Sequence, residues 1–511
     1  MGRKILFVTT DQQRYDALGC NGGHVAKTPV IDALARQGIR YTRGHANSVV
    51  CQPARSSMLT GQYTRTHGVT MNGMELPHSA PSVAEFLQSK GYRTAIVGKA
   101  HFDPLMDPMA RFAETQLCVG GKTGPLRGFE HARLATHTVQ GWLHYALEMN
   151  AQHPEHCDGF YKVIDIATLD VNGVGGGDTG AVQVKHNPVP RALYHTDWVA
   201  DEAIAWLNSL DADQDWFCWL SFPDPHHPWD PPASELGRVN WRELDLPAGY
   251  LPPDQAREVL KTKPSQWLDW YEGRLVTNFE APPKWIPAHM TADQLREVDA
   301  MNHIENELID EALGRVIAAI AAKGWEQDTD VVYTADHGEL QGDFGLLFKG
   351  PYHVDALMRL PMVWRPAPSA GVAAGEVSKP VQQVDLAPTF CAIAGHAVPD
   401  WMQGAPLPQS NEAAVRNWSL TEWDSNLRGI EQHLRTLYLE DGADQWVATF
   451  YEAGSIHDGS EGELYNLRLD PLQHHNRWSE PAHAALRQRL HEKLLSILPP
   501  KGAKLERLTS V

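Results

Sequence analysis

Apolar residues along this chain gather in short runs that alternate with longer segments of helical spacing. The run KILFVTT at residues 4–10 is almost continuously apolar, which is typical of a strand buried on both faces of a sheet. Similar runs predict further strands at 92–98, 216–222, 330–335 and 360–365. Helical spacing predicts helices at 28–38, 82–91, 197–210 and 291–323.

The alternation of predicted strands and helices indicates an α/β fold. Because strand–helix–strand units place their strands parallel, we expect a mostly parallel sheet sandwiched by helices. Residues 119–195 and 223–290 interrupt the alternation, and we expect both to be insertions that build a substrate pocket or a subunit contact. Short alternating runs such as 446–454, then a helix near 481–497, follow in the last part of the chain. These patterns predict a main domain at 1–405 and a small C-terminal α+β subdomain at 406–511.

Composition narrows the class of protein. The 511 residues suit a large α/β enzyme with an appendage. Lys and Arg number 44 against 63 Asp and Glu, and the resulting net charge of -19 argues against nucleic-acid binding. The 6 cysteines have no C-x-x-C spacing and predict no disulfide framework. No apolar run is long enough for a membrane span or a signal peptide, so we expect a cytoplasmic protein without membrane contact.

Polar, ionisable residues directly follow four of the predicted strands. In open α/β sheets, ligands bind beyond the carboxyl ends of parallel strands, so these residues should share one edge of the sheet. The residues concerned are Asp11, Gln12, Lys99, His101, Asp224, His226, His227, Asp336, His337 and Glu339. A single residue of this kind is usually an ordinary strand end or helix cap, but four strand ends together indicate one functional constellation.

Four of these side chains suggest a metal site. Asp11, Gln12 and Asp336 offer carboxylate and amide oxygens, which suit a hard divalent cation such as Ca²⁺ or Mg²⁺. His337 shifts the preference towards Mn²⁺ or a similar transition ion. We therefore predict one divalent metal ion, with Mn²⁺ or Ca²⁺ preferred. The alternative is that each residue is only a polar strand end.

The segment VVCQPARSSMLTGQ at 49–62 places a cysteine just before a predicted helix. Pro53 suits a first helical turn, so Cys51 should lie at a helix N-terminus, where free N–H groups and the helix dipole favour anions. Arg55, one turn later, can point back at the same position. From these residues alone, Cys51 is a buried thiol, a nucleophile, a metal ligand or the precursor of a modified residue.

The motif C-x-P-x-R followed by SSMLTG resembles the signature of the type I sulfatases, formylglycine-dependent members of the alkaline phosphatase superfamily. The resemblance covers nearly the whole chain, because further landmarks occur in the family's order. They are TTDQQRYDALGC, GYRTAIVGKAHF, FPDPHHPWDPP, TADHGELQGDFGLLFKG, VDLAPTFCAIAG and ELYNLRLDPLQHHN. The first motif alone is a weak pattern, but the set in this order and context is very specific. The resemblance is to the arylsulfatase and phosphonate monoester hydrolase branch of the family.

The resemblance implies an alkaline phosphatase-like fold and covalent hydrolysis of small-molecule esters. Cys51 would be oxidised by a separate formylglycine-generating enzyme, and the hydrated aldehyde would attack sulfur or phosphorus. Arg55 would hold this hydrate and offset charge. The metal ligands that the resemblance implies are Asp11, Gln12, Asp336, His337 and the residue derived from Cys51.

The same resemblance implies roles around the transferred group. Lys99 and Lys349 would bind its non-bridging oxygens and stabilise charge in the transition state. His101 would be the base that collapses the covalent intermediate. His226 would contact the bridging oxygen and, with Lys349, help to protonate the leaving group. Asn72 would contact the substrate or lie just behind the groups that do.

The metal and anion residues resemble different branches of the family. Gln12 and His337 resemble the phosphonate monoester hydrolases, whereas many sulfatases have Asp and Asn there. Lys99 and His101 resemble the sulfatases, and they would touch the transferred group. The leading prediction is therefore a sulfatase acting on aryl sulfate monoesters, with side activity on phosphonate monoesters and phosphodiesters.

Two other functions remain open from the sequence. In the first, hydrolysis of phosphonate monoesters or phosphodiesters is the main activity. In the second, the protein binds an anion or a metal without catalysis, and Cys51 stays a thiol. A homo-oligomer, either a dimer or a tetramer, is expected because this branch commonly assembles.

Overall fold

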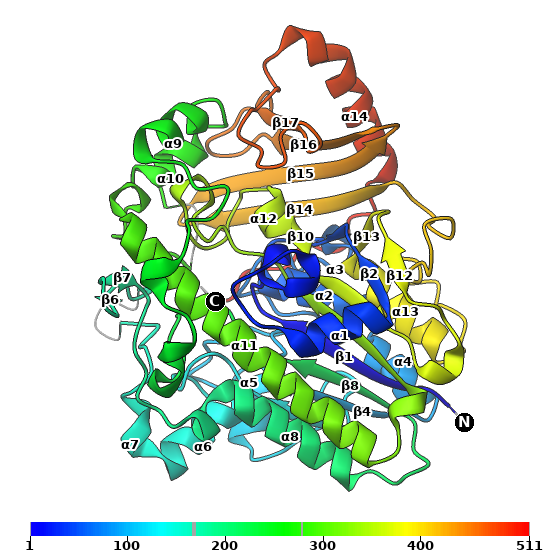
Figure 1. Cartoon of the computed structure of the whole chain (residues 1–511). Coiled ribbons are helices and arrows are strands. Elements are labelled where there is room, and N and C mark those ends of the chain that lie inside the picture. Colours follow the sequence, from blue (N-terminus) through cyan, green and yellow to red (C-terminus); the bar gives the residue numbers. More distant parts are fainter. Residues whose placement is uncertain (1, 166–169, 277–279, 510–511) are drawn as a thin grey trace.

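One large sheet with helices on both faces forms the body of the molecule, and a second sheet packs beside it (Figure 1). The computed structural model describes residues 2–165, 170–276 and 280–509. The central sheet has the strand order β12-β2-β11-β9-β1-β8-β4-β5. In that order the strands are β12 (Gly375–Val377), β2 (Ile39–Tyr41), β11 (Met362–Arg365), β9 (Thr329–Ala335), β1 (Lys4–Thr10), β8 (Trp216–Ser221), β4 (Arg93–Gly98) and β5 (His131–Leu134).

The central sheet is mostly parallel, as the sequence predicts. Strand β11 runs antiparallel to β9 and β2, and the other neighbouring pairs among the described strands are parallel. The five strands expected from apolar runs are β1, β4, β8, β9 and β11. The prediction misses the short strands β2, β5 and β12, and β5 lies within the segment 119–195 that the sequence suggests is an insertion.

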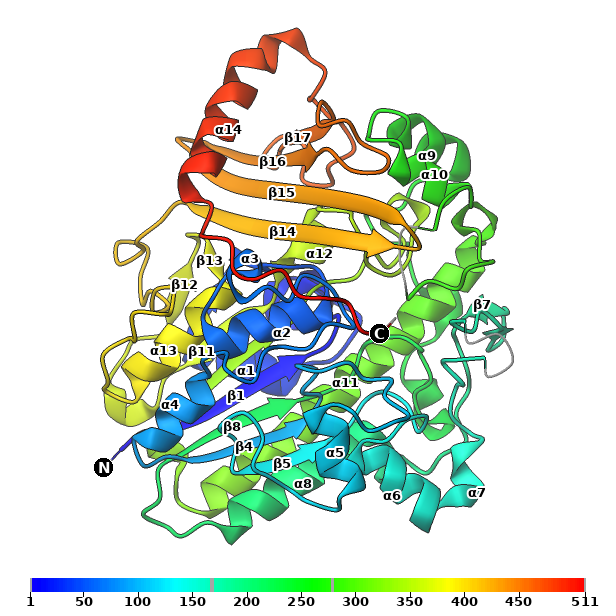
Figure 2. The same cartoon turned by 180° about the vertical axis from the view of Figure 1, so that it is seen from behind.

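Helices cover both faces of the central sheet. One face carries α1 (Pro29–Gln37), α8 (His195–Ser209) and α11 (Ala292–Ala322), which lie in front in Figure 1. The other face carries α2 (Cys51–Thr60), α4 (Val83–Ser89) and α13 (Leu386–Ile393), which lie in front in Figure 2. The predicted helices at 28–38, 82–91, 197–210 and 291–323 are confirmed as α1, α4, α8 and α11.

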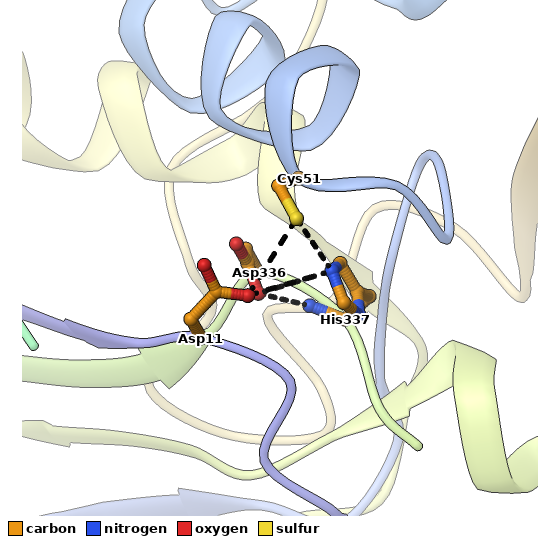
Figure 3. A group of neighbouring side chains, drawn as sticks. All are labelled: Asp11, Cys51, Asp336 and His337. Carbon is orange, nitrogen blue, oxygen red and sulfur yellow. Dashed lines mark hydrogen bonds and ion pairs between the residues drawn. The ribbon is translucent and has the colours of Figure 1, made fainter. Parts of the chain in front are cut away.

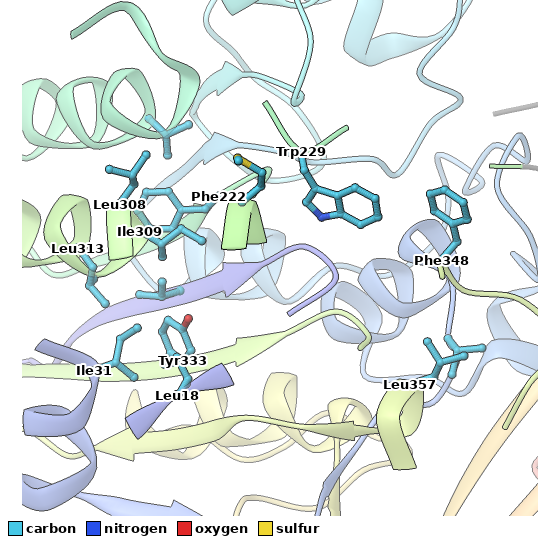
Figure 4. Packing of buried hydrophobic residues seen from close by; sticks show 14 of the residues in the cluster. Leu18, Ile31, Phe222, Trp229, Leu308, Ile309, Leu313, Tyr333, Phe348 and Leu357 are labelled. Atoms are coloured by element: carbon cyan, nitrogen blue, oxygen red, sulfur yellow. The ribbon is translucent and has the colours of Figure 1, made fainter. Parts of the chain in front are cut away.

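The two helical layers explain why β1 is apolar along its whole length. Side chains alternate between the faces of a strand, and both faces are covered here. Leu6 and Val8 pack with the α11 side, while Ile5 and Phe7 pack with the α13 side. Figure 4 shows part of the first cluster, in which Leu308, Ile309 and Leu313 of α11 approach Ile31 and Tyr333.

A four-stranded antiparallel sheet occupies the C-terminal part of the chain (Figure 1). Its strands are β14 (Trp418–Leu427), β15 (Ile430–Asp441), β16 (Asp444–Glu452) and β17 (Gly462–Asn466), and α14 (Ala484–Ile497) packs on it. The backbone N–H of Glu422 on β14 donates to the carbonyl of Asn47, at 2.9 Å. The second sheet is thereby tied to the segment that leads into α2.

The remaining helices lie in loops around the central sheet. They are α3 (Thr64–His67), α5 (Ala113–Val119), α6 (His144–Gln152), α7 (Pro154–Cys157), α9 (Pro253–Leu260), α10 (Gln266–Tyr271) and α12 (Asp355–Met358). Two small sheets complete the described strands. One has the order β10-β3-β13, formed by β10 (Arg359–Leu360), β3 (Gly44–His45) and β13 (Val381–Gln382), and the other pairs β6 (Gly175–Gly176) with β7 (Ala181–Val182). No helix in the described ranges combines the length and apolar character that crossing a bilayer requires.

After α14 the chain returns across the main domain beside α2 (Figure 2). We call residues 498–509 the C-terminal tail. The N–H of Gly502 donates to the carbonyl of Arg65 at 2.8 Å, and the N–H of Leu508 donates to the carbonyl of Gly73 at 2.7 Å. The guanidinium of Arg507 donates to the carbonyl of Asn72 at 3.2 Å. The tail therefore covers the segment that follows α2.

Burial on α11 predicts a strong dependence of stability on Leu313, which is 0% exposed. Leu313→Ala should lower the free energy of unfolding by about 2–5 kcal/mol, because apolar transfer is lost and a cavity remains. The matched change Leu495→Ala, at a side chain that is 57% exposed, should alter it by less than about 0.5 kcal/mol. Urea unfolding followed by circular dichroism measures both, and equal effects would contradict the described packing.

Candidate active site

Four neighbouring parallel strands bring the predicted site residues to one edge of the sheet. The strands β9, β1, β8 and β4 are adjacent, and their carboxyl ends align with Thr334, Thr9, Ser221 and Gly98 in register. Backbone hydrogen bonds continue past these ends, since Lys99 N–H donates to the Ser221 carbonyl at 2.9 Å. The shared edge that the sequence predicts is therefore confirmed for these strands.

The side chain of Arg55 joins the ends of all four strands. It is 0% exposed, and its Nε donates to Asp336 Oδ2 at 2.9 Å. One terminal nitrogen donates to the Lys99 carbonyl at 2.7 Å and to Ser221 Oγ at 2.8 Å, and the other reaches Asp11 Oδ2 at 3.5 Å. A fully buried guanidinium of this kind is stable only because carboxylates and carbonyls satisfy it.

Asp11, Cys51, Asp336 and His337 converge on a single point (Figure 3). Each contributes one ligand atom, and these atoms all lie within 4.8 Å of one another. Cys51 Sγ is 3.1 Å from His337 Nε2 and 3.6 Å from Asp11 Oδ1. Two carboxylates, an imidazole and a sulfur that face one another in a buried space form a donor set that fits a divalent cation.

The protonation states of this group suit metal binding. Burial raises the pKa of Asp11, but Lys99, His226 and Arg55 outweigh it and hold the pKa well below the ordinary value. Burial lowers the pKa of His337 despite the nearby Asp336, which leaves a neutral ring. Metal ions require a deprotonated carboxylate and a neutral imidazole, and both conditions are met here.

Gln12 lies beside this group in a different orientation. Its backbone N–H donates to Asp336 Oδ1 at 3.0 Å, and its φ of 65° turns the chain sharply after β1. Its side-chain oxygen accepts from Lys349 Nζ at 2.8 Å, and its amide nitrogen donates to Glu339. The structure thus shows Gln12 between a lysine and a glutamate, and its role as a metal ligand stays a prediction.

Cys51 is the first residue of α2 and is fully buried. Burial and the adjacent Asp11 carboxylate raise the pKa of its thiol far above the ordinary value. The thiol is consequently protonated and poorly nucleophilic in the environment that the protein side chains provide. Its placement at a helix N-terminus, as the sequence predicts, is confirmed.

A second cluster lies on the other side of Cys51. Lys349 Nζ is 2.8 Å from His226 Nε2 and forms an ion pair with Glu280. Glu280 Oε2 is 3.1 Å from His226 Nε2, and its Oε1 accepts from Asn72 Nδ2 at 3.0 Å. Asn72 also accepts the backbone N–H of residue 52 on α2, at 3.1 Å, so it links this cluster to the helix of Cys51.

His101 lies in a tight turn beyond β4, with a φ of 57°. Glu114 holds this turn by accepting the backbone N–H groups of His101, Phe102 and Asp103 at 3.3, 2.7 and 3.2 Å. Both ring nitrogens of His101 are buried and find no hydrogen-bond partner among the described residues. An unpartnered buried imidazole is costly, which indicates a site built for a polar ligand.

A cavity of about 70 Å³ opens beside this histidine. Lys99, His101 and Glu280 line one side of it. Its other walls are mainly apolar and include Leu105, Met106, Trp142, Leu143, Val163 and Ile164. The ring of His137 stacks on His226, with centroids 4.5 Å apart. The cavity therefore joins a polar, charged end to an apolar end.

Sequence reasoning missed two polar residues of this region and one contact of a third. Glu280 and His137 lie in the two segments predicted as insertions, where no strand end or repeated spacing marks them. Glu339 follows β9 and was visible as a strand-end residue, yet its contact with Gln12 depends on a turn that the sequence does not reveal. The rule that ligands bind beyond the carboxyl ends of strands identifies residues that follow a strand directly. It does not identify site residues that lie in long loops.

Comparison with known families matches this geometry. The sequence model described as Sulfatase matches residues 3–396. The chain belongs to the sulfatase family. A second model, described as N-sulphoglucosamine sulphohydrolase, C-terminal, matches residues 342–498 of the same sulfatase-family chain. The resemblance drawn from the motifs is thereby confirmed, and so is the alkaline phosphatase-like α/β fold.

Individual relatives match this sulfatase-family member along most of its length. An arylsulfatase of Clostridium perfringens is 26% identical over 501 residues, covering 93% of this chain and 93% of the relative. The uncharacterized sulfatase YidJ of Escherichia coli is 25% identical over 495 residues, covering 97% and 86%. The crystal structure of a phosphonate monoester hydrolase of Agrobacterium radiobacter has a TM-score of 0.76 at 24% identity, covering 97% and 95%, and shares the fold.

The donor set in Figure 3 predicts that divalent cations stabilise the folded protein. Mn²⁺ or Ca²⁺ at about 100 times its dissociation constant should add about 2.7 kcal/mol to the free energy of unfolding, because the cation binds only the folded site. The measurement is the rise in apparent melting temperature of chelator-treated protein when the ion is restored.

Asp336→Asn and His337→Ala should each remove this rise. Asp178→Asn is the matched control, because Asp178 belongs to a separate carboxylate and histidine group with His186 and Glu297. The control should keep the full rise. An undiminished rise in both site variants would show that the cation binds elsewhere.

Proposed function

We propose that this protein hydrolyses sulfate monoesters through a formylglycine made from Cys51. The observation that carries the proposal is the position of Cys51, buried at the N-terminus of α2 and 3.1 Å from His337 Nε2, with Arg55 one turn behind it. A protonated, unactivated thiol is a poor nucleophile, so its placement at the centre of the site supports a precursor role. When formed, the hydrated aldehyde would supply one hydroxyl to attack the ester and displace its alcohol, and deprotonation of the second hydroxyl would expel inorganic sulfate and restore the aldehyde.

Asp11, Asp336, His337 and the residue derived from Cys51 would hold the divalent metal ion, and Gln12 is the remaining candidate ligand. A bound cation of this kind acidifies a nearby hydroxyl and neutralises charge on a substrate oxygen. Support comes from the donor atoms within 4.8 Å of one another. The sulfatase family generally uses both a metal ion and formylglycine.

Lys99, His101 and Lys349 are proposed to act on the transferred group. Lys99 pairs with Asp11 at the strand ends, and its ammonium is proposed to bind a non-bridging oxygen. The unpartnered ring nitrogens of His101 are available to take up a proton during product release. Lys349 and His226, in contact at 2.8 Å, are proposed to deliver a proton to the leaving oxygen, while Asn72 holds the neighbouring Glu280.

The leaving group is proposed to be aromatic. The apolar walls of the cavity beside His101, with Trp142, Leu105 and Met106, suit a flat apolar group attached to the ester oxygen. The similarity to the arylsulfatase of Clostridium perfringens supports the same class of substrate. A formylglycine-generating enzyme would be the partner during maturation.

A second candidate activity is hydrolysis of phosphonate monoesters and phosphodiesters. The observation in its favour is the pair Gln12 and His337, which resembles that branch, together with a fold shared with a phosphonate monoester hydrolase at a TM-score of 0.76. Both reactions require a singly charged tetrahedral group at the same position. We therefore propose it as a side activity.

Conversion of Cys51 predicts a defined mass change. The tryptic peptide Gly44–Arg55 should show the deficit that corresponds to replacing the thiol-bearing CH₂SH group with an aldehyde. Mass spectrometry of protein co-expressed with a formylglycine-generating enzyme makes the measurement, with the Cys51→Ala peptide as the control. An unmodified thiol under these conditions, in an active protein, would contradict the formylglycine mechanism.

Loss of Lys99 or His101 should separate the two candidate activities. Lys99→Ala should lower kcat for nitrophenyl sulfate by about 10²–10³-fold, since it removes a preorganised charge, and His101→Ala should lower it by about 10²–10⁴-fold. Lys122→Ala, an exposed lysine outside the site, is the matched control. Steady-state kinetics with nitrophenyl sulfate and nitrophenyl phenylphosphonate provide the test. Slow sulfate turnover that is indifferent to both variants would favour the second activity.

A further inference from the structure

Glu280 places a negative charge where the substrate anion is expected to bind. Its carboxylate pairs with Lys349 and lies 3.1 Å from His226 Nε2 and 3.2 Å from His227 Nε2. Its second oxygen accepts from Asn72 at 3.0 Å. One ligand atom each of Glu280, His226 and Cys51 lies within 4.8 Å of the others. The carboxylate therefore stands next to the point of attack.

The contacts of Glu280 hold it firmly in this position. Its side chain is 8% exposed, and a lysine, two histidines and an asparagine bind its two oxygens. Burying an isolated carboxylate would carry a large desolvation free energy, and the ion pair with Lys349 offsets this cost. Part of the positive charge of Lys349 is thus already neutralised before any substrate enters.

This arrangement discriminates between substrates by charge. Coulomb repulsion from a fixed carboxylate rises in proportion to the negative charge on the transferred group, so a dianion is repelled about twice as strongly as a monoanion. Sulfate monoesters, phosphonate monoesters and phosphodiesters carry one negative charge in neutral solution. Phosphate monoesters carry two once the pH exceeds a second pKa of about 6.

We propose that Glu280 is a specificity-determining residue that selects esters with a singly charged transferred group and rejects the dianions of phosphate monoesters. The inference rests on the proposed function, because it assumes that Lys349 and His226 face the transferred group. It extends that function by assigning a charge selector that lies outside the predicted catalytic set. No bond is made or broken by Glu280 itself.

The test compares kcat/KM of Glu280→Gln and of the unaltered protein for esters that share 4-nitrophenol as the leaving group. The substrates are 4-nitrophenyl phosphate, 4-nitrophenyl sulfate and bis(4-nitrophenyl) phosphate at about pH 8, where the first is a dianion. The ratio of kcat/KM for the dianion to kcat/KM for each monoanion should rise by roughly tenfold to a hundredfold in Glu280→Gln, because one unit of repulsion near 5 Å is removed. Enzyme with verified conversion of Cys51 is used throughout.

Two control variants separate charge from packing. Glu280→Asp keeps the charge and should keep the low ratio even if its turnover falls. Glu258→Gln changes an exposed glutamate on α9 and should change neither ratio nor rate. An equal fall for all three substrates in Glu280→Gln would reduce Glu280 to a positioning role and overturn the proposal.

If Glu280→Gln does not fold, a measurement on the unaltered protein, together with Glu280→Asp, tests whether the site rejects dianions as the proposal requires. As the pH falls from about 8 through about 6, 4-nitrophenyl phosphate becomes a monoanion, whereas the charge of bis(4-nitrophenyl) phosphate does not change. The kcat/KM for 4-nitrophenyl phosphate divided by that for bis(4-nitrophenyl) phosphate should therefore rise as the pH falls. Titrations of enzyme groups that affect both substrates equally cancel in this ratio. A constant or falling ratio overturns the selector. Failure to hydrolyse sulfate or the diester, with rapid phosphate monoester hydrolysis, overturns both the selector and the proposed function.

Discussion

The buried guanidinium of Arg55 is the interaction on which the site depends. A parallel sheet ends in four separate chain segments, and nothing in strand pairing alone fixes where their last side chains point. Arg55 contacts the residues that follow or end β1, β4, β8 and β9, so one planar fork of donors sets their relative positions. Because its charge is satisfied by Asp336 and Asp11, the same contacts fix the orientation of both carboxylates.

Ion pairs fix the positions of the other charged side chains in the pocket in the same way. Lys99 pairs with Asp11, and Lys349 pairs with Glu280, so the positive groups that would meet an anion are each held by a carboxylate. Such pairs are stable when buried only if their geometry is fixed and their remaining hydrogen bonds are made. The resulting site is preorganised, which is the condition for electrostatic catalysis.

Much of this arrangement could be predicted from the sequence, and the remaining features could not be predicted for physical reasons. Apolar runs reveal β1, β4, β8 and β9, and the rule for strand ends then places Asp11, Lys99 and Asp336 together. Strands β2, β5 and β12 are too short to show a period, and pairing with neighbouring strands in the sheet stabilises them. Glu280 reaches the site from an irregular segment through long-range contacts, for which a single sequence carries no signal.

The C-terminal tail and the burial of Cys51 bear on the order in which folding and modification of this cysteine can occur. The tail follows α2 by more than 400 residues in the chain, yet it binds Asn72 and Gly73, and Asn72 in turn accepts the backbone N–H of residue 52 on α2. The Cys51 side chain is 0% exposed in the folded structure. An enzyme that modifies this cysteine would therefore have to reach it before the surrounding chain has folded. Maturation and folding would then compete for the same chain.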